Sequence, residues 1–268
     1  MRFAFAVAAC LLVVACHKDA SPPSTTQPTN ATEAAPPAGD PALDAEREQF
    51  LSDASAFLKI SKAEVLDRTT VHNTGMKDEW KAWEDKGPMT DARIKQFYKE
   101  TKNYIFDLGG WHLWDPRKHT SDLAFVDELK QAGVKNVLDF GGGVGFNSLL
   151  FAKAGIDTTL ADLDSVTLQF AMFRAEQQHV KLKFWKSDVE PMPPDAKYDA
   201  IVCLDVLEHL PQAELKTAVD KLVKLKHANT KIIIHAPFGR TAQHPMHLDA
   251  SEETNRQVVR LQTELPKD

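Results

Sequence analysis

The sequence predicts a doubly wound α/β fold, with a mostly parallel sheet of about five strands and a helical cap formed by the N-terminal part of the chain. From residue 134 onward, short apolar runs alternate with segments that are long enough for crossover helices. The first run ends in a glycine-rich turn, and before it the apolar residues keep helical spacing. This order of elements is typical of a parallel sheet with helices on both faces.

The predicted strands are continuous apolar runs, as expected where a strand is buried on both faces of a sheet. They are Val134–Phe140, Asp157–Ala161, Leu182–Trp185, Tyr198–Leu204 and Lys231–Ala236. After the last run, Ser251–Gln262 predicts a helix that Ser251 caps, with Glu252 and Glu253 in its first turn. No β-rich hairpin follows, so we expect five parallel strands within a domain that covers residues 121–268.

The first sixteen residues have the features of a bacterial lipoprotein signal. Arg2 precedes an apolar run from Phe3 to Ala15, and Cys16 follows. Cys10 fits the same loose pattern, but cleavage there would leave an apolar stub. Residues 17–42 are rich in Pro, Ser, Thr and Ala, which predicts a flexible tether. We therefore expect a lipid anchor at Cys16 and a location in the cell envelope, or in the cytoplasm if the signal is not used.

Residues 43–120 are predicted to form the helical cap. Phe50, Ala54 and Phe57 keep helical spacing, as do Ile94 and Phe97 later in the segment. Four of the five tryptophans of the chain fall in this region, where they either pack in a core or contact a ligand; they are Trp80, Trp83, Trp111 and Trp114.

The composition is that of a soluble globular protein, with 43% hydrophobic and 26% charged residues among 268. The formal net charge is -6, and no cluster of Lys and Arg stands out, so we expect no nucleic-acid partner. Cys203 lies in an apolar strand and is predicted to be a small buried hydrophobic residue rather than a nucleophile. The sequence itself predicts no oligomeric state.

The glycine-rich turn after the first strand reads Asp139-Phe140-Gly141-Gly142-Gly143-Val144-Gly145. Glycines let a backbone turn sharply and approach a ligand closely. The dinucleotide fingerprint Gly-x-Gly-x-x-Gly does not fit, because Phe146 or Ser148 occupies the place of its last glycine. The carboxylate of Asp139 would repel a pyrophosphate and attract an ammonium group.

Three further stretches follow in order. Asp162 ends the second strand, where an acid can accept hydrogen bonds from both hydroxyls of a ribose; Asp164 is a poorer candidate. Asp188 and Val189 follow the third strand, and Asp199–Leu210 covers the fourth strand and the turn after it. Together with the glycine turn, this order resembles the class I S-adenosylmethionine (SAM)-dependent methyltransferases, in particular the small-molecule and ubiquinone-type O-methyltransferases.

The resemblance implies a Rossmann-like domain over roughly residues 120–250, with SAM as the cofactor. It places eight residues at the cofactor: Asp139, Gly141, Gly143, Gly145, Asp162, Asp188, Val189 and Asp205. The implied reaction transfers a methyl group to an oxygen or nitrogen atom of a small-molecule acceptor. The alternative is a domain that binds SAM without catalysis, in a membrane-anchored lipoprotein. A nucleotide-dependent oxidoreductase is a more distant rival.

The candidate catalytic residues follow the fourth and fifth strands, whose carboxyl ends meet at one edge of the sheet. They are Glu208, His209 and His247, with His244 nearby in the sequence. A neutral histidine could take the proton of the acceptor. Asp205, Glu208 and His209 could instead hold a divalent metal that lowers the pKa of an acceptor hydroxyl. The third interpretation is that Glu208 and His209 only cap and pack a helix.

Overall fold

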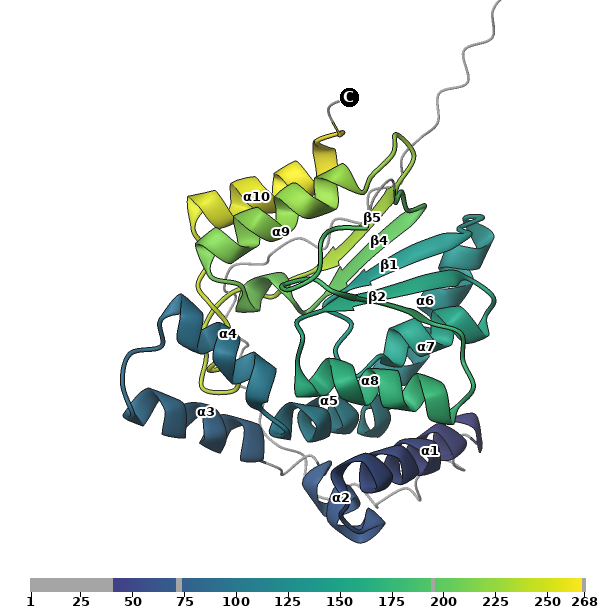
Figure 1. Cartoon of the computed structure of the whole chain (residues 1–268), viewed down its shortest axis with the longest axis vertical. Helices are drawn as coiled ribbons and strands as arrows, with labels where there is room; N and C mark the ends of the chain where they lie inside the picture. Colours follow the sequence, from purple (N-terminus) through teal and green to yellow (C-terminus); the bar gives the residue numbers. More distant parts are fainter. Residues whose placement is uncertain (1–40, 71–73, 194–195, 267–268) are drawn as a thin grey trace, which may run out of the picture. The chain divides into compact units, whose positions relative to one another are not determined.

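The five strands form a single parallel sheet in the order β3-β2-β1-β4-β5 (Figure 1). The strands are β1 (Asn136–Phe140), β2 (Asp157–Asp162), β3 (Lys183–Lys186), β4 (Ala200–Leu204) and β5 (Lys231–His235). All four pairings are parallel, which confirms the predicted doubly wound α/β fold. The strand order reverses between β1 and β4, and ligands of such sheets bind outside the carboxyl ends of the strands at this point.

The structure is a computed structural model that describes residues 41–70, 74–193 and 196–266, without the side chains of residues 116 and 117. The predicted signal peptide with Cys16, and residues 17–40 of the predicted tether, lie outside this part of the chain. None of the helices in the described part combines the length and the hydropathy that crossing a membrane requires.

Alternate residues of the central strands pack into two different cores. Ile201 and Cys203 of β4 belong to a cluster with helices α9 (Gln212–Lys224) and α10 (Glu252–Thr263). Ala200 and Val202 of the same strand belong to a cluster with α6 (Pro116–Gln131) and α7 (Phe146–Lys153). Helices therefore cover both faces, as Figure 1 shows. Cys203 is fully buried, and burial raises the pKa of its thiol, as expected of a hydrophobic residue.

Helices also account for the N-terminal part of the described chain. They are α1 (Pro41–Leu58), α2 (Lys62–Arg68), α3 (Gly75–Asp85), α4 (Asp91–Glu100) and α5 (Asn103–Trp114). The residues with helical spacing are buried, including Phe50, Ala54 and Phe97. Helix α6 crosses the predicted boundary at residue 120, because Val126 and Leu129 pack with Phe151 of α7 under the sheet.

A buried arginine joins α1 to the start of α7. Phe50 of α1 stacks on Phe146 with ring centroids 5.4 Å apart. The guanidinium of Arg174, on α8 (Val166–Gln177), lies 4.3 Å from the centre of the Phe146 ring and donates to the carbonyl of Val144 at 2.7 Å. Asp53 of α1 lies 3.8 Å from the same guanidinium. These contacts hold helix α1 of the cap against the residues that end the glycine turn and begin α7.

The chain after β5 forms a long loop and then α10. The hydroxyl of Ser251 accepts a hydrogen bond from the amide of Thr254, which is the predicted N-cap. Helix α10 packs on α9 and, within the described residues, no strand follows β5. The sheet therefore has the five strands that the sequence predicts.

Candidate active site

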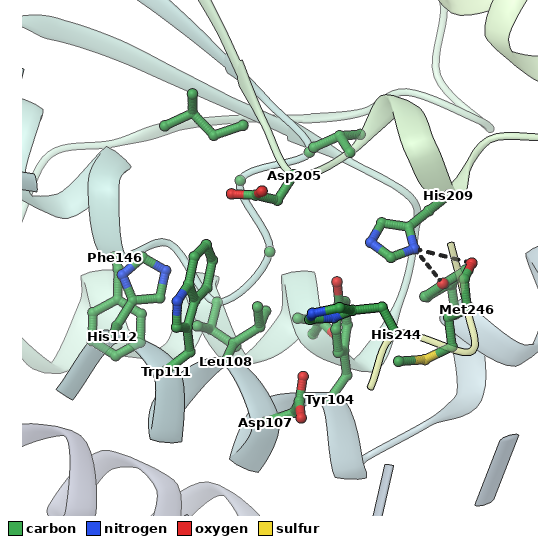
Figure 2. Close-up of a pocket in the computed structure, with 18 of the residues that line it drawn as sticks. Tyr104, Asp107, Leu108, Trp111, His112, Phe146, Asp205, His209, His244 and Met246 are labelled. Carbon is green, nitrogen blue, oxygen red and sulfur yellow. Dashed lines mark hydrogen bonds between the residues drawn. The ribbon is translucent and has the colours of Figure 1, made fainter. Parts of the chain in front are cut away.

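A cavity of about 1130 Å³ opens at the carboxyl ends of the strands (Figure 2). Its walls come from the glycine turn after β1, the segments that follow β2, β4 and β5, and the cap helix α5. Strand ends that are far apart in the sequence therefore meet around one space. Of the residues predicted from the sequence, the cavity is lined by Asp139, Gly141, Gly143, Asp162, Asp205, His209, His244 and His247.

The glycine turn is pressed against the end of β4. Gly141 has a φ of 77°, which is in the left-handed region. A Cβ atom at this position would lie 2.3 Å from Cγ2 of Val206, which follows β4. No larger residue fits at position 141 unless the segment after β4 moves away from β1.

Asp162 ties the glycine turn to the end of β2. Its Oδ2 accepts a hydrogen bond from the amide of Gly143 at 2.8 Å, and its Oδ1 accepts one from the amide of Leu163 at 2.7 Å. Burial raises the pKa of Asp162 to about 6. Each carboxylate oxygen keeps a further lone pair, so Asp162 can also accept bonds from a ligand in the cavity. Asp164 instead pairs with Lys186 at 3.0 Å and does not line the cavity.

Asp139 lies near the end of β1, directly before the glycine turn. Its Oδ2 accepts a hydrogen bond from the hydroxyl of Ser148 at 2.6 Å, and burial raises its pKa to about 6. Lys118, from α6, lines the same cavity. Lys118 also contacts Asp122 and lies 4.7 Å from the centre of the Trp111 ring. A carboxylate and an ammonium thus flank this part of the cavity.

Asp188 and Val189 do not join the other predicted residues. Lys99 of α4 donates to the carboxylate of Asp188 at 2.9 Å, and the amide of Asp164 donates to it at 2.8 Å. Val189 is 57% exposed, and neither residue lines the cavity. The sequence reasoning could not foresee this, because Lys99 reaches Asp188 from a helix almost ninety residues earlier. Their neighbour Ser187 does line the cavity.

Asp205 pairs with a histidine that the sequence analysis did not select. Its Oδ1 lies 2.6 Å from Nδ1 of His235, the last residue of β5. Among the described residues, the group of potential metal ligands contains His247 in place of Asp205, whose carboxylate contacts His235 of β5. The trio of Asp205, Glu208 and His209, one of the three interpretations of the sequence, is therefore not the group that the structure brings together. His235 could have been selected from the sequence, because it is a polar residue at the carboxyl end of an apolar strand, where ligands bind.

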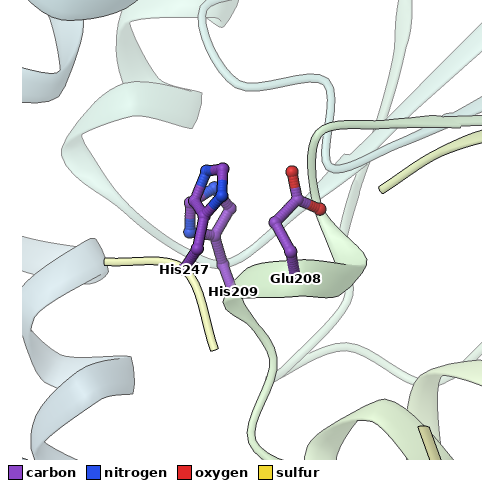
Figure 3. Close-up of side chains that lie close together, drawn as sticks. All are labelled: Glu208, His209 and His247. Atoms are coloured by element: carbon purple, nitrogen blue, oxygen red, sulfur yellow. The ribbon is translucent and has the colours of Figure 1, made fainter. Parts of the chain in front are cut away.

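Glu208, His209 and His247 form a group of potential metal ligands in the described residues (Figure 3). One ligand atom from each residue lies within 4.8 Å of the others. Glu208, in the 3-10 helix η1 (Leu207–His209), is fully buried, and both its carboxylate oxygens lack a hydrogen-bond partner in this part of the structure. Burial raises the pKa of Glu208 to about 8.

The ring of His209 is held by the cap. Its Nδ1 lies 2.9 Å from the hydroxyl of Tyr98 on α4, and 3.4 Å from the carbonyl oxygen of Met246. Burial, with a smaller contribution from His247, lowers the pKa of His209 to about 4. The His247 ring lies edge-on to His209 and is stacked on His244. His209 is thus a neutral hydrogen-bonding group.

The cap contributes lining residues that sequence reasoning placed only in general terms. Trp111 and Trp114 line the cavity, whereas Trp80 is buried in a separate core with Phe97. Asp107 and Tyr104 of α5 complete the far wall, as Figure 2 shows. Core packing therefore describes Trp80, whereas Trp111 and Trp114 are placed where they can contact a ligand.

The close approach at Gly141 predicts a large loss of stability on substitution. Gly141→Ala should lower the free energy of unfolding by at least about 2 kcal/mol more than Gly133→Ala, since overpacking adds to the strain of a left-handed alanine. Gly133 is the matched control, because its φ of 73° is similar but no atom lies within 4 Å of its Cβ position. Urea unfolding measures both, and equal losses would contradict the proposed contact.

Burial of Glu208 predicts a dependence of stability on pH. A carboxyl group whose pKa is raised on folding contributes stability below its unfolded pKa, and this is lost as the pH rises through about 8. Glu208→Gln cannot ionise, so it should gain at least about 2 kcal/mol relative to the wild type between about pH 5 and pH 9. Urea unfolding in EDTA tests this. Glu252→Gln, at a 94% exposed side chain, should show no such gain.

Comparison with known proteins places this geometry in context. Residues 137–227 match the family model described as a methyltransferase domain. The ubiquinone biosynthesis O-methyltransferase of Coxiella burnetii (strain Dugway 5J108-111) is 32% identical over 104 residues, which cover 38% of this chain and 43% of that protein. The protein of the same name from Alkalilimnicola ehrlichii is 28% identical over 131 residues, 44% of this chain and 53% of the relative. The chain spans about half the length of the curated relatives that it matches.

Solved structures also resemble parts of the chain. The magnesium protoporphyrin IX methyltransferase of Synechocystis has a TM-score of 0.45 and 20% identity, over 63% of this chain and 83% of that one. The N-methyltransferase NodS of Bradyrhizobium japonicum has a TM-score of 0.44 and 21% identity, over 56% and 78% of the two chains. The glycine turn and strands β2, β3 and β4 lie within the matched residues 137–227, whereas β5 lies outside them. The matched part of the chain is similar to a methyltransferase domain.

Proposed function

We propose that this chain is a SAM-dependent methyltransferase that acts on an oxygen or nitrogen atom of a small molecule. The observation that carries the proposal is the pairing of Asp162 with the amide of Gly143 in the wall of the cavity. It presents a partly buried carboxylate and a glycine turn to the same ligand, in a segment that matches the methyltransferase domain family. The resemblance to ubiquinone-type enzymes supports a small acceptor.

The cofactor half of the cavity would be formed by the glycine turn and the ends of β1 and β2. Asp162 would accept hydrogen bonds from the ribose hydroxyls, and Asp139 would attract the ammonium of the methionine moiety. Lys118, which lines the same cavity, would attract its carboxylate. SAM supplies a methyl group that its sulfonium already activates, so the protein mainly has to align donor and acceptor.

The acceptor half would lie between α5 and the loop after β5. Tyr104 and Asp107 face this space from α5, and His244 and Met246 face it from the loop, as Figure 2 shows. Aromatic, carboxylate and imidazole groups together suit a polar small molecule with an apolar body. Both walls belong to segments outside the most regular part of the sheet, so they can differ between related proteins without loss of the cofactor half.

The predicted lipid anchor at Cys16 remains part of the proposal, with a location in the cell envelope. It is supported by the order of charge, apolar run and cysteine at the start of the sequence. A domain outside the cytoplasm would need a supply of SAM, which is the reason to keep a non-catalytic SAM-binding domain as the alternative.

The cofactor assignment predicts the effect of removing Asp162. Asp162→Ala should weaken the binding of S-adenosylhomocysteine at least about tenfold, because two charge-assisted hydrogen bonds to the ribose are lost. Isothermal titration calorimetry measures the affinity, and NAD serves as a ligand that should not bind. Asp164→Ala is the matched control, since Asp164 pairs with Lys186 outside the cavity. Unchanged affinity in Asp162→Ala would move the ribose site elsewhere.

A tritiated SAM assay with a panel of small acceptors then separates the two functions. Methyl transfer to any acceptor supports the enzyme, whereas S-adenosylhomocysteine binding without turnover on the panel favours the non-catalytic domain. The binding and turnover measurements use the same preparation, so a misfolded protein is recognised by failure of the first.

We also propose that Glu208, His209 and His247 hold a divalent metal. Two imidazoles and one carboxylate form a donor set that suits Zn²⁺, and the two orphaned oxygens of buried Glu208 favour it. Bound there, a metal would lower the pKa of an acceptor hydroxyl. Zn²⁺ or Mg²⁺ should raise the melting temperature of the EDTA-treated protein, and should have no effect in Glu208→Gln. EDTA should also abolish turnover reversibly. No thermal shift with either metal would contradict the site.

A further inference from the structure

We propose that His235, oriented by Asp205, is the group that takes the proton of the methyl acceptor. This inference rests on the proposed methyl transfer and names its general base. Neither His235 nor the pair was expected from the sequence, because the two residues lie thirty positions apart and meet only where β4 and β5 end.

Two contacts fix the pair. Leu204 and His235 are register partners at the ends of β4 and β5, so Asp205 follows directly beside His235. The amide of Asp205 donates to the carbonyl of His235 at 2.8 Å, and the carboxylate Oδ1 of Asp205 lies 2.6 Å from Nδ1 of the His235 ring. Both residues line the cavity. His235 is therefore held both by its backbone carbonyl and by one of its two ring nitrogens.

The pair leaves the second ring nitrogen free to act. A carboxylate at Nδ1 favours the tautomer that carries its proton there, so Nε2 presents a lone pair. No other hydrogen bond of this ring is present among the described residues, and the side chain is 51% exposed. An acceptor in the cavity can therefore reach Nε2 without displacing a protein group.

The backbone at Asp205 is strained in a way that serves this contact. Asp205 has a φ of 55°, in the left-handed region, where few residues other than glycine, Asn and Asp are found. Such strain persists only where the surrounding contacts hold it, and it concentrates at functional sites. Here the bend directs the carboxylate across to β5.

Two other histidines of the cavity are less suited to this role. Nδ1 of His209 is engaged by Tyr98, and its ring is buried enough to remain neutral. His112 is buried, bonded to Asp122 and stacked on Phe146. By contrast, the Asp205 hydrogen bond raises the pKa of His235. Two other ionisable groups also act on the pKa of His235: Glu208 from η1 raises it when ionised, and Lys118 from α6 lowers it.

The proposed reaction couples the transfer of the methyl group to the removal of a proton from the acceptor. The acceptor oxygen or nitrogen forms a bond to the methyl carbon while the carbon–sulfur bond breaks, and sulfur keeps that electron pair as a neutral thioether. The proton of the acceptor passes to Nε2 of His235, and the Asp205 carboxylate stabilises the resulting imidazolium. An acceptor that attacks as a carboxylate or a thiolate would not need this group.

The chain contains a matched control at the opposite end of the same two strands. His227 precedes β5, and its Nε2 lies 3.3 Å from the carboxylate of Asp199, which precedes β4. This second Asp–His pair also links the β4 and β5 segments, but it does not line the cavity. His227→Asn therefore removes a comparable pair without touching the proposed site.

The test uses the full chain, tritiated SAM and two acceptor probes, catechol for a hydroxyl and phenethylamine for an amine. The variants are His235→Asn, Asp205→Asn and His227→Asn, and Asn suits the left-handed backbone at position 205. Initial rates are measured across the pH range, and calorimetry with S-adenosylhomocysteine and thermal unfolding are run on each variant. The probe that accepts methyl groups identifies the acceptor class.

We expect His235→Asn to lower kcat on the accepted probe by about 10²-fold or more. The affinity for S-adenosylhomocysteine should stay within about twofold of the wild type. The wild-type rate should rise with pH through the pKa of His235. This increase of the rate with pH should be absent in His235→Asn. In Asp205→Asn the increase should occur at lower pH than in the wild type. The Asp205→Asn shift keeps the test decisive if His235→Asn folds poorly.

Three outcomes would overturn the inference. His235→Asn could keep the rate and its increase with pH, or His227→Asn could lose as much activity as His235→Asn. The wild type could also methylate neither probe while it binds S-adenosylhomocysteine, which would leave the cofactor site intact and remove the need for a base. Failure to bind S-adenosylhomocysteine would instead refute the proposed function itself.

Discussion

The site depends on the close contact between the glycine turn and the ends of the two strands beside β1. Gly141 lies against Val206 after β4, and Gly143 donates to Asp162 at the end of β2. The amide of Gly141 also donates to the carbonyl of Ala161 at 2.7 Å. A parallel sheet brings these strand ends to one edge, and only a turn without side chains can be pressed between them. The cavity walls follow from this constraint.

Burial of ionisable groups at this edge has a consistent physical cause. The cap helices remove water from the strand ends, so charged forms of the buried groups are disfavoured. The pKa values of Asp139 and Asp162 rise to about 6, and that of Glu208 to about 8, while that of His209 falls to about 4. The Asp205–His235 pair differs because it is more exposed and because the Asp205 hydrogen bond raises the pKa of His235. The cavity thus combines buried ionisable groups with shifted pKa values and one more exposed Asp–His pair.

The cap is held to the sheet by two groups of contacts. Phe50 and Asp53 of α1 meet Phe146 and Arg174, directly after the glycine turn. Lys99 and Tyr98 of α4 reach Asp188 and His209 on the other side. A buried arginine between aromatic rings is costly to leave unpaired, so these contacts define the position of the cap. The space between them is left for ligands.

The sequence by itself determined the parallel sheet, the glycine turn and the acidic residue at the end of β2. These are local features, since apolar runs, glycine spacing and capping residues act over a few positions. It also predicted that the ends of β4 and β5 would share one cavity, because topology alone brings them together. Only the tertiary structure decided which side chains pair there. The carboxylate of Asp205 contacts His235, and that of Asp188 accepts a hydrogen bond from Lys99. Partners from distant elements compete for each carboxylate, and neither sequence spacing nor residue type reveals which of them is within reach.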